Sequence, residues 1–309
     1  MSSPPRVAIL PSSTDDIERA VTEGGGVVVD IEDADALVWT DPRSPQQLKE
    51  VLETSEVDWV QLPFAGIETF FEAGVIDPSL TWTCAKGIYG PACAEHALAL
   101  MLAAARRIHV HARAESWSKL GLDSPEYRLE HKTVVVVGTG GIGSALVPMV
   151  RPLGLRIIGV NRSGRALEGA EHTVAVDELA AVLPESDFVV IAAAYTDATH
   201  HLFDESKFAA MGSHSWIVNV ARGGLIDTDA LVASLRAGDI GGAALDVTDP
   251  EPLPDGHPLW GLENCLITPH VANTWAMGLA ELPGLVRRNV AARSAGTRME
   301  GLVDPQLGY

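Results

Sequence analysis

The residues whose types and spacing could do chemistry begin with a glycine-rich loop. Gly138, Gly140 and Gly143 stand at the spacing G-x-G-x-x-G in the run G-T-G-G-I-G. In such a loop the first glycine allows a tight turn, the second lets the backbone approach a pyrophosphate, and the third lets a helix pack closely on a strand. N–H groups at a following helix N-terminus would add an anion site. We therefore predict that a dinucleotide binds at Gly138, Gly140, Gly141, Ile142 and Gly143.

The segments around this loop matter because G-x-G-x-x-G alone is a weak signal in a chain with 29 glycines. Residues 133–137 are all Thr or Val, which is typical of a strand buried on both faces of a parallel sheet. An apolar helical segment follows at 144–150, although Pro148 interrupts it, and another strand is predicted at 156–160. A strand, a glycine loop, a helix and a second strand in this order favour a dinucleotide site.

Short strands and helices alternate along the rest of the chain. Strands are predicted at 6–10, 27–30, 36–40, 59–62, 81–84, 188–192, 216–219 and 243–245. Helices are predicted at 14–23, 44–54 and 92–109, with a final helical segment that ends at 295 and is interrupted by Pro283. The polar stretch 111–132 should be a connector onto which Trp117 packs back. This alternation predicts α/β architecture on parallel sheets.

Composition and charge exclude several classes of protein. The length of 309 residues predicts two domains. A net charge of −19, with five lysines and seventeen arginines, argues against nucleic acid or an anionic membrane as a partner. The longest apolar run, 97–105, is far shorter than the roughly 20 residues that cross a bilayer, and no signal-peptide pattern opens the chain. A cytoplasmic protein is expected. The three cysteines, Cys84, Cys93 and Cys265, lack metal-like spacing and should be reduced and mostly buried; no metal site is predicted.

Four motifs in order carry a family resemblance. They are the glycine loop, N-V-A-R-G-G-L-I-D at 219–227, L-D-V-T-D-P-E-P-L-P at 245–254, and I-T-P-H-V-A at 267–272. In these motifs, and in the closing V-D-P-Q-L-G-Y, the chain resembles the D-isomer-specific 2-hydroxyacid dehydrogenases. The resemblance implies an α/β fold in which a Rossmann-type nucleotide domain is inserted into a smaller, flavodoxin-like substrate domain. Residues 1–96 and 285–309 would form the substrate (catalytic) domain and residues 97–284 the dinucleotide-binding domain. It also implies a homodimer.

The resemblance assigns the catalytic roles to three residues. Reduction of a 2-oxo acid needs a hydride donor, a proton donor and a positive charge. The planar guanidinium of Arg222 could hold the carboxylate and the adjacent carbonyl oxygen together. His270 would be the acid, because imidazole titrates near working pH. Glu251 would accept a hydrogen bond from the imidazole, favour its charged form and orient it. Glutamate at this position also disfavours formate dehydrogenase activity, which has no proton to donate.

A second loop resembles the carboxylate-binding turn of the family. Backbone N–H groups of Ala65 and Gly66 would receive the substrate, although an ordinary turn after a strand remains the alternative. Phe64 replaces the smaller residues common there, and Tyr89 replaces an expected Asn in the hinge turn. Trp275, five residues after His270, would either border the side-chain pocket or be a core aromatic.

The cofactor prediction depends on the end of the second strand of the nucleotide domain. An NAD site expects a carboxylate about 20 residues after the glycine loop, on the ribose hydroxyls. Asn161 stands there instead, and Arg162, Ser163 and Arg165 follow it. An amide does not repel a 2′-phosphate, and the arginines could bind one, so NADP is favoured. The alternative is NAD bound through Asn161, with the arginines solvated.

Two further cofactor residues follow from the family pattern. Thr199, with Thr196, matches the threonines after the fourth strand. Asp246, at a later strand end, would receive the nicotinamide carboxamide.

The leading functional hypothesis is an NAD(P)-dependent D-2-hydroxyacid dehydrogenase acting on a small 2-oxo acid such as glyoxylate or hydroxypyruvate. One alternative is D-3-phosphoglycerate dehydrogenase, which Asp41 beside Arg43 and the lack of a C-terminal regulatory domain disfavour. A non-enzymatic dinucleotide-sensing protein is the other alternative. The complete set of Arg222, Glu251 and His270 weakens it.

Overall fold

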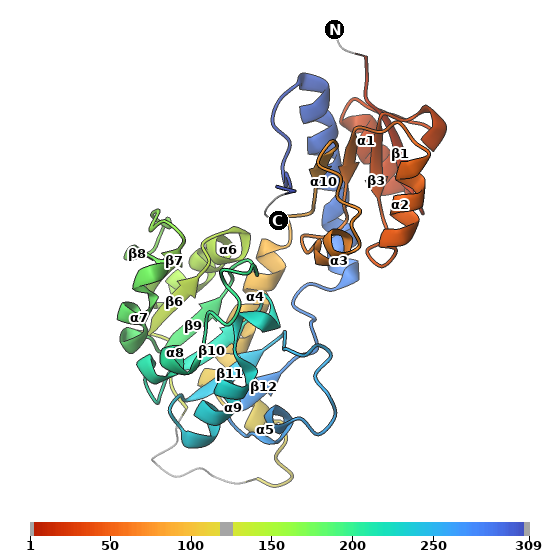
Figure 1. Cartoon of the computed structure of the whole chain (residues 1–309). Helices are drawn as coiled ribbons and strands as arrows, with labels where there is room; N and C mark the ends of the chain where they lie inside the picture. Colours follow the sequence, from red (N-terminus) through yellow and green to blue (C-terminus); the bar gives the residue numbers. More distant parts are fainter. Residues whose placement is uncertain (1–2, 118–125, 306–309) are drawn as a thin grey trace. The chain divides into compact units, whose positions relative to one another are not determined.

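The computed structural model describes residues 3–117 and 126–305. The last four residues of the closing V-D-P-Q-L-G-Y motif lie outside them. The chain forms two compact units (Figure 1): a terminal unit of residues 1–89 and 274–309, and a central unit of residues 90–273. These units divide at 89/90 and 273/274, and the domain boundaries at 96/97 and 284/285 stay a prediction. The helix Gly90–Ala105 packs against other helices and two strands of the central unit, and the C-terminal helix Trp275–Ala295 packs in the terminal unit.

The terminal unit has a five-stranded parallel sheet in the order β2-β1-β3-β4-β5, which is the flavodoxin-like order. Its strands are β1 Arg6–Leu10, β2 Val27–Val28, β3 Ala36–Trp39, β4 Trp59–Gln61 and β5 Thr81–Thr83. Its helices are α1 Asp15–Glu23, α2 Pro45–Glu53, α3 Glu68–Glu72 and α10 Trp275–Ala295. Helices α1 and α10 pack on one face of the sheet, and α2 and α3 pack on the other.

The central unit has a seven-stranded parallel sheet in the order β12-β11-β10-β9-β6-β7-β8. Its strands are β6 Thr133–Val137, β7 Arg156–Asn161, β8 His172–Ala175, β9 Phe188–Ile191, β10 Trp216–Asn219, β11 Gly242–Leu245 and β12 Cys265–Ile267. Its helices are α4 Gly90–Ala105, α5 Ile108–His111, α6 Gly141–Val150, α7 Leu179–Val182, α8 Glu205–Ala210 and α9 Thr228–Ala237. Six of these strands follow the Rossmann order, with β12 added at one edge. The predicted fold class is confirmed.

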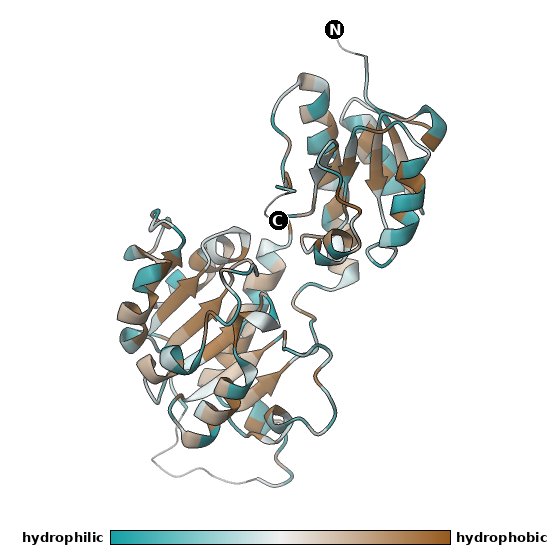
Figure 2. Cartoon of the chain, in the orientation of Figure 1, coloured by the Kyte–Doolittle hydropathy of each residue, from teal (hydrophilic) through white to brown (hydrophobic). Residues whose placement is uncertain are grey.

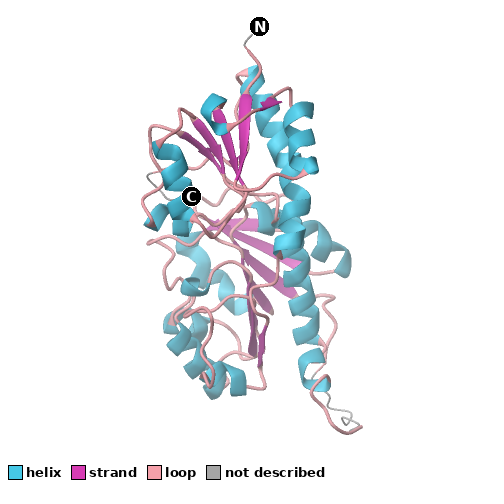
Figure 3. Cartoon of the chain, turned by 90° about the vertical axis from the view of Figure 1, so that its right-hand side faces the viewer, coloured by secondary structure: helices cyan, strands magenta, loops and turns pink. Residues whose placement is uncertain are grey.

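Alternation of side chains along the central strands creates two cores. Val134 and Val136 point into a core shared with α4 and α6, whereas Val135 and Val137 point into a core shared with α7, α8 and α9. The strands are accordingly apolar in Figure 2 and lie between helices in Figure 3. Burial on both faces explains why these strands read as unbroken apolar runs.

Several local predictions were wrong. The predicted helix 92–109 is broken, because Arg107 adopts a left-handed backbone (φ 47°) between α4 and α5. Pro283 does not interrupt the last helix, since α10 continues through it, as α6 does through Pro148. A proline removes one backbone donor, and the buried side chains of Leu282 and its neighbours hold this helix against the sheet. Trp117 does not pack back: it is 93% exposed.

A fully buried set of polar side chains joins α10 to the sheet of the terminal unit. Trp59 Nε1 donates to Thr83 Oγ1, and Thr83 Oγ1 donates to Gln61 Oε1, both at 2.8 Å. The Asn289 amide donates to the same Gln61 oxygen at 2.8 Å. It also donates to the carbonyl oxygen of Glu300 (3.0 Å) and accepts from its N–H (2.7 Å). Asn289 therefore fixes both the helix and the segment that follows it.

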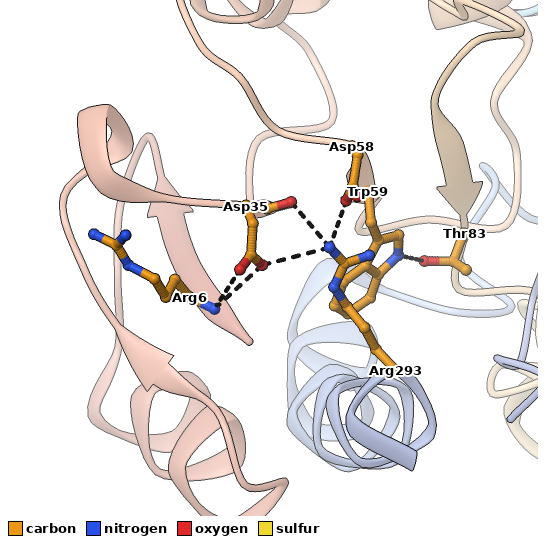
Figure 4. Close-up of polar contacts among 6 residues, drawn as sticks. All are labelled: Arg6, Asp35, Asp58, Trp59, Thr83 and Arg293. Carbon is orange, nitrogen blue, oxygen red and sulfur yellow. Dashed lines mark hydrogen bonds and ion pairs between the residues drawn. The ribbon is translucent and has the colours of Figure 1, made fainter. Parts of the chain in front are cut away.

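Arg293, one turn further along α10, makes a more exposed contact (Figure 4). Its guanidinium pairs with the carboxylates of Asp35 and Asp58, which immediately precede β3 and β4, and lies 5.7 Å from the ring centre of Trp59. The Asp35 carboxylate also accepts from the backbone N–H of Arg6 at 3.2 Å. These ion pairs are partly solvated, so they should contribute less than the buried amide.

Substitution of the two α10 residues should show this difference. Asn289→Ala removes one of the two donors to the buried Gln61 oxygen and both side-chain bonds to the backbone of Glu300, and should lower the free energy of unfolding by about 2–3 kcal/mol. Arg293→Gln should lower it by about 1 kcal/mol. Urea denaturation of both variants measures the two values. A larger loss of unfolding free energy for Arg293→Gln than for Asn289→Ala would contradict this account of how α10 is held on the sheet.

Candidate functional site

Three glycines of the loop after β6 differ in the space around them. Gly138 has φ 99°, and a Cβ there would lie 2.4 Å from the carbonyl carbon of Ala192. A Cβ on Gly143 would lie 2.1 Å from the carbonyl oxygen of Gly138, so only glycine lets α6 pack this closely on the turn. At Gly140 a Cβ would meet no heavy atom of the described chain within 4 Å. Open space at the middle glycine is what a pyrophosphate requires.

The N-terminus of α6 completes this loop. Gly140 is the N-cap residue, and no side chain among the described residues caps the helix. The first-turn N–H groups at Gly141, Ile142 and Gly143 have no acceptor within the helix, so they are suited to phosphate oxygens. The residues present therefore fit a dinucleotide.

The Asn161 side chain organises the turn after β7. Its Nδ2 donates to Thr139 Oγ1 in the glycine loop (2.9 Å) and to the carbonyl oxygen of Arg165 (2.7 Å). Its Oδ1 accepts from the backbone N–H groups of Ser163 and Arg165, both at 3.1 Å. Arg162, Ser163 and Arg165 are exposed on this turn. An aspartate could accept as Asn161 does, but it could not donate either bond.

Asn219, the last residue of β10, holds the segment that carries Arg222. Asn219 is fully buried; its Nδ2 donates to the carbonyl oxygen of Arg222 (2.8 Å) and its Oδ1 accepts from Ala221 N–H (3.0 Å). The Arg222 guanidinium donates to the carbonyl oxygen of Ala221 at 2.7 Å and is half-buried. A Cβ on Gly223 would lie 2.0 Å from the Thr248 backbone, so the loops after β10 and β11 touch.

Asp246, the residue after β11, holds the segment that carries His270. Its buried carboxylate accepts from Thr268 Oγ1 (2.6 Å) and from the N–H groups of Val271 and Ala272 (both 2.9 Å). His96 Nε2 on α4 lies 3.3 Å from the same carboxylate. Burial alone would raise the pKa of Asp246, but the hydrogen bonds from His96, Thr268 and the two amides outweigh it and lower the pKa to about 2.

His270 is fixed on its backbone and on one ring nitrogen. The backbone N–H of His270 donates to the carbonyl oxygen of Asp246 (2.8 Å), and the His270 backbone is left-handed (φ 52°). Nδ1 lies 2.5 Å from Glu251 Oε1. The side chains of His270 and Glu251 are 48% and 40% exposed. A carboxylate on Nδ1 orients the imidazole so that Nε2 can exchange a proton with a ligand.

Arg222 and His270 thus follow β10 and β12, the two parallel strands on either side of β11, so they belong to the same, carboxyl-terminal edge of the sheet. Charges of both Asp246 and Arg222 act on the half-buried thiol of Cys93 in α4. Burial is the main cause that raises the pKa of Cys93 to about 11, Asp246 raises it further, and Arg222 opposes both. The face of α4 that carries Cys93 and His96 therefore lies at this edge.

Thr199 shapes the loop after β9. Its hydroxyl donates to the carbonyl oxygen of Ala194 and accepts from Thr196 N–H, both at 2.8 Å. Contacts of Thr199 and Asp246 with the cofactor stay predictions, and the protein donors already on Asp246 would compete with a carboxamide.

The loop 64–66 lies in the terminal unit, where Ala65 is exposed and Gly66 half-buried. The Phe64 ring packs edge-on against Trp275 (5.1 Å between centroids) and Tyr89 (6.1 Å). The Tyr89 hydroxyl donates to the carbonyl oxygen of Pro63. Trp275 remains 40% exposed, so it is not a core aromatic.

Three residues that organise the site were not predicted from the sequence: His96, Asn219 and Thr268. A polar residue that ends an apolar strand was the available signal for Asn219, and Thr268 stood inside a recognised motif. Nothing local marked His96.

Neither a metal-binding cluster nor a membrane-spanning helix is found in the part of the chain that the structure describes. It contains no group of three or more His, Cys, Asp or Glu side chains placed to hold a metal ion. None of its helices is both long and apolar enough to cross a membrane.

Comparison with known proteins shows which family this chain is similar to. The NAD binding domain of the D-isomer specific 2-hydroxyacid dehydrogenases matches residues 98–272. An uncharacterized protein of Corynebacterium melassecola is 40% identical over 94% of this chain and 95% of its own length. A glyoxylate reductase of Pyrococcus furiosus is 29% identical, over 94% of this chain and 95% of that enzyme. A D-isomer specific 2-hydroxyacid dehydrogenase of Xanthobacter autotrophicus, solved with NADPH and MES, superposes with a TM-score of 0.82 at 25% identity, covering 99% of this chain and all of that one.

The low pKa of Asp246 makes stability depend on pH. A carboxyl whose folded pKa is depressed stabilises the fold above its unfolded pKa of 3.8, and this contribution is lost as pH falls toward about 2. It amounts to about 2 kcal/mol. Urea denaturation between pH 5 and about 2 should therefore show a steeper loss for the wild type than for Asp246→Asn. Asp239→Asn, at an exposed position, is the control and should keep the wild-type slope. Equal slopes for the wild type and Asp246→Asn would contradict this.

Proposed function

Because the chain belongs to the D-isomer specific 2-hydroxyacid dehydrogenase family of oxidoreductases, we propose that it reduces a small 2-oxo acid, glyoxylate or hydroxypyruvate, to the D-2-hydroxy acid with NADPH. The observation that carries this proposal is the 2.5 Å contact between His270 Nδ1 and Glu251, on a turn fixed at the same sheet edge as Arg222. The name of the Pyrococcus furiosus relative, glyoxylate reductase, supports the choice of acid.

Arg222 binds the substrate in this proposal. A guanidinium carries a permanent charge and two parallel N–H donors, which suit a carboxylate and the neighbouring 2-oxo oxygen. Asn219 holds the backbone on which this guanidinium sits. Orientation of the carbonyl therefore depends on a buried amide that does not itself contact the substrate.

His270 supplies the proton. Glu251 accepts a hydrogen bond from Nδ1 and stabilises the imidazolium, so Nε2–H can protonate the oxygen that becomes the hydroxyl. When bound, the reduced nicotinamide supplies the hydride that this carbonyl carbon accepts. In the reverse direction His270 Nε2 takes the hydroxyl proton.

The loop in the terminal unit is assigned a binding role. We propose that backbone N–H groups of Ala65 and Gly66 hold the substrate carboxylate, because exposed amides after a strand can bind an anion. A homodimer and a cytoplasmic location are proposed on the resemblance and the sequence.

NADPH is proposed over NADH because of the Asn161 turn. Its amide brings no negative charge toward a 2′-phosphate, and the turn presents Arg162, Ser163 and Arg165 at the surface beside the glycine loop. The Xanthobacter autotrophicus structure with NADPH supports this choice.

An activity panel tests the proposed reaction. NADPH oxidation is followed with glyoxylate, hydroxypyruvate or phosphohydroxypyruvate, each repeated with NADH. The protein should reduce one of the first two, and His270→Gln should lower kcat by about 10²- to 10⁴-fold, because the proton donor is lost. His172→Gln, at an exposed position on β8, is the control and should keep wild-type activity. No turnover with any of the acids, or full activity of His270→Gln, would refute the proposal; a preference for phosphohydroxypyruvate would replace the substrate.

Asn161→Asp tests the choice of nucleotide. The aspartate cannot donate to Thr139 or Arg165 and repels a 2′-phosphate, so kcat/KM for NADPH should fall by about tenfold or more while that for NADH falls less. Asn161→Ala loses the hydrogen bonds to Thr139 and Arg165 without adding charge, so it separates the effect of the lost hydrogen bonds from the effect of charge repulsion. A wild-type protein that uses NADH at least about tenfold better than NADPH would exclude the NADPH assignment.

A further inference from the structure

A polar side chain on α4 lies at the catalytic edge of the sheet without a role in the reaction described above. His96 lies three residues after Cys93 on α4, a helix that packs on β10 and β11. Its side chain is 21% exposed. Nε2 lies 2.9 Å from Thr268 Oγ1 and 3.3 Å from Asp246 Oδ1.

The direction of these hydrogen bonds follows from chemistry. The Asp246 carboxylate is ionised and can only accept, so the Thr268 hydroxyl must give its single hydrogen to Oδ1 across 2.6 Å. The hydroxyl oxygen must then accept from His96. His96 therefore carries its proton on Nε2, and one N–H serves both the hydroxyl and the carboxylate.

The Asp246 carboxylate connects His96 and Thr268 to the turn that carries His270. Asp246 Oδ1 accepts from Val271 N–H and Oδ2 from Ala272 N–H, and these two residues directly follow His270. The His270 N–H donates to the backbone of Asp246. The left-handed backbone of His270 has a conformational cost, which such surrounding contacts must offset.

We propose that His96 is a positioning residue: through Thr268 and Asp246 it holds the turn that presents the His270 imidazole. The proposal rests on the proposed role of His270 as proton donor. It assigns to α4 a part in orienting the proton donor that the four sequence motifs do not contain, since His96 lies 172 residues from Thr268 in the chain.

Two variants of His96 separate positioning from bulk packing. His96→Leu removes the N–H donor but keeps an apolar stem, whereas His96→Gln restores an N–H near the former place of Nε2. Glu95→Gln, at the exposed neighbouring position, is the matched control. The readouts are kcat, KM for NADPH, and amide hydrogen exchange of residues 268–272 in the nucleotide-free protein.

For His96→Leu we expect kcat to fall about tenfold, while KM for NADPH changes by less than about twofold. Exchange at Val271 and Ala272 should become about tenfold faster, because their acceptor is less well held. His96→Gln should recover most of both losses, and Glu95→Gln should match the wild type.

The proposal is overturned if His96→Leu leaves kcat and amide exchange at wild-type values, or if His96→Gln loses as much as His96→Leu. Should His96→Leu fail to fold, Thr268→Val and Thr268→Ser give the same comparison, and the serine must retain more of both properties. If the wild type reduces no 2-oxo acid, the proposed function fails. Amide exchange then still decides whether His96 holds the turn.

Discussion

The buried carboxylate of Asp246 is the contact on which the order of the site depends. One side chain accepts from a hydroxyl, two backbone amides and an imidazole, and these donors come from α4 and from the segment after β12. A buried charge is tolerated only when its lone pairs are satisfied. The requirement works in both directions: the donors keep the carboxylate ionised, and the carboxylate keeps the backbone around His270 in one conformation. Asn219 has the same role in the segment that carries Arg222: its uncharged amide binds the backbone there and keeps that segment in one conformation.

Local pattern was sufficient for much of the fold. The run 133–137, the glycine loop and the apolar strands at 188–192 and 216–219 were predicted within a residue of their observed ends, because strands buried on both faces carry an unbroken apolar signal. β8 was missed because its residues, His172–Ala175, lie at the sheet edge and none is buried. The continuity of α10 through Pro283 was also missed. Tertiary packing overrode a local helix breaker there, which sequence propensity does not include.

For the site, roles that a motif states could be predicted, but contacts that the fold creates could not, even for Asn219 and Thr268, which stand inside two of the motifs. Arg222, Glu251 and His270 stood in recognisable segments, and the structure gives Glu251 and His270 a direct contact. His96 and Asn161 show the opposite case. His96 acts across 172 residues of chain, and Asn161 proved to be a donor that ties the glycine loop to the next turn. Both properties depend on which side chains the fold brings within 3 Å, and one sequence without geometry does not supply that.

The insertion of the central unit has a consequence for how the chain is made on the ribosome. Residues 90–273 are contiguous and complete their own sheet, whereas residues 1–89 lack α10 until the last part of the chain emerges. Leu282, Val286 and Val290 of α10 cover the face of the terminal sheet that includes Val7, Val38 and Trp59. During synthesis that apolar face stays open while about 180 further residues are translated, for roughly 10–40 seconds at 5–20 residues per second. Residues 1–89 are thus made before the central unit but become a closed domain after it, and in that interval they are the part of the nascent chain that chaperones would have to protect.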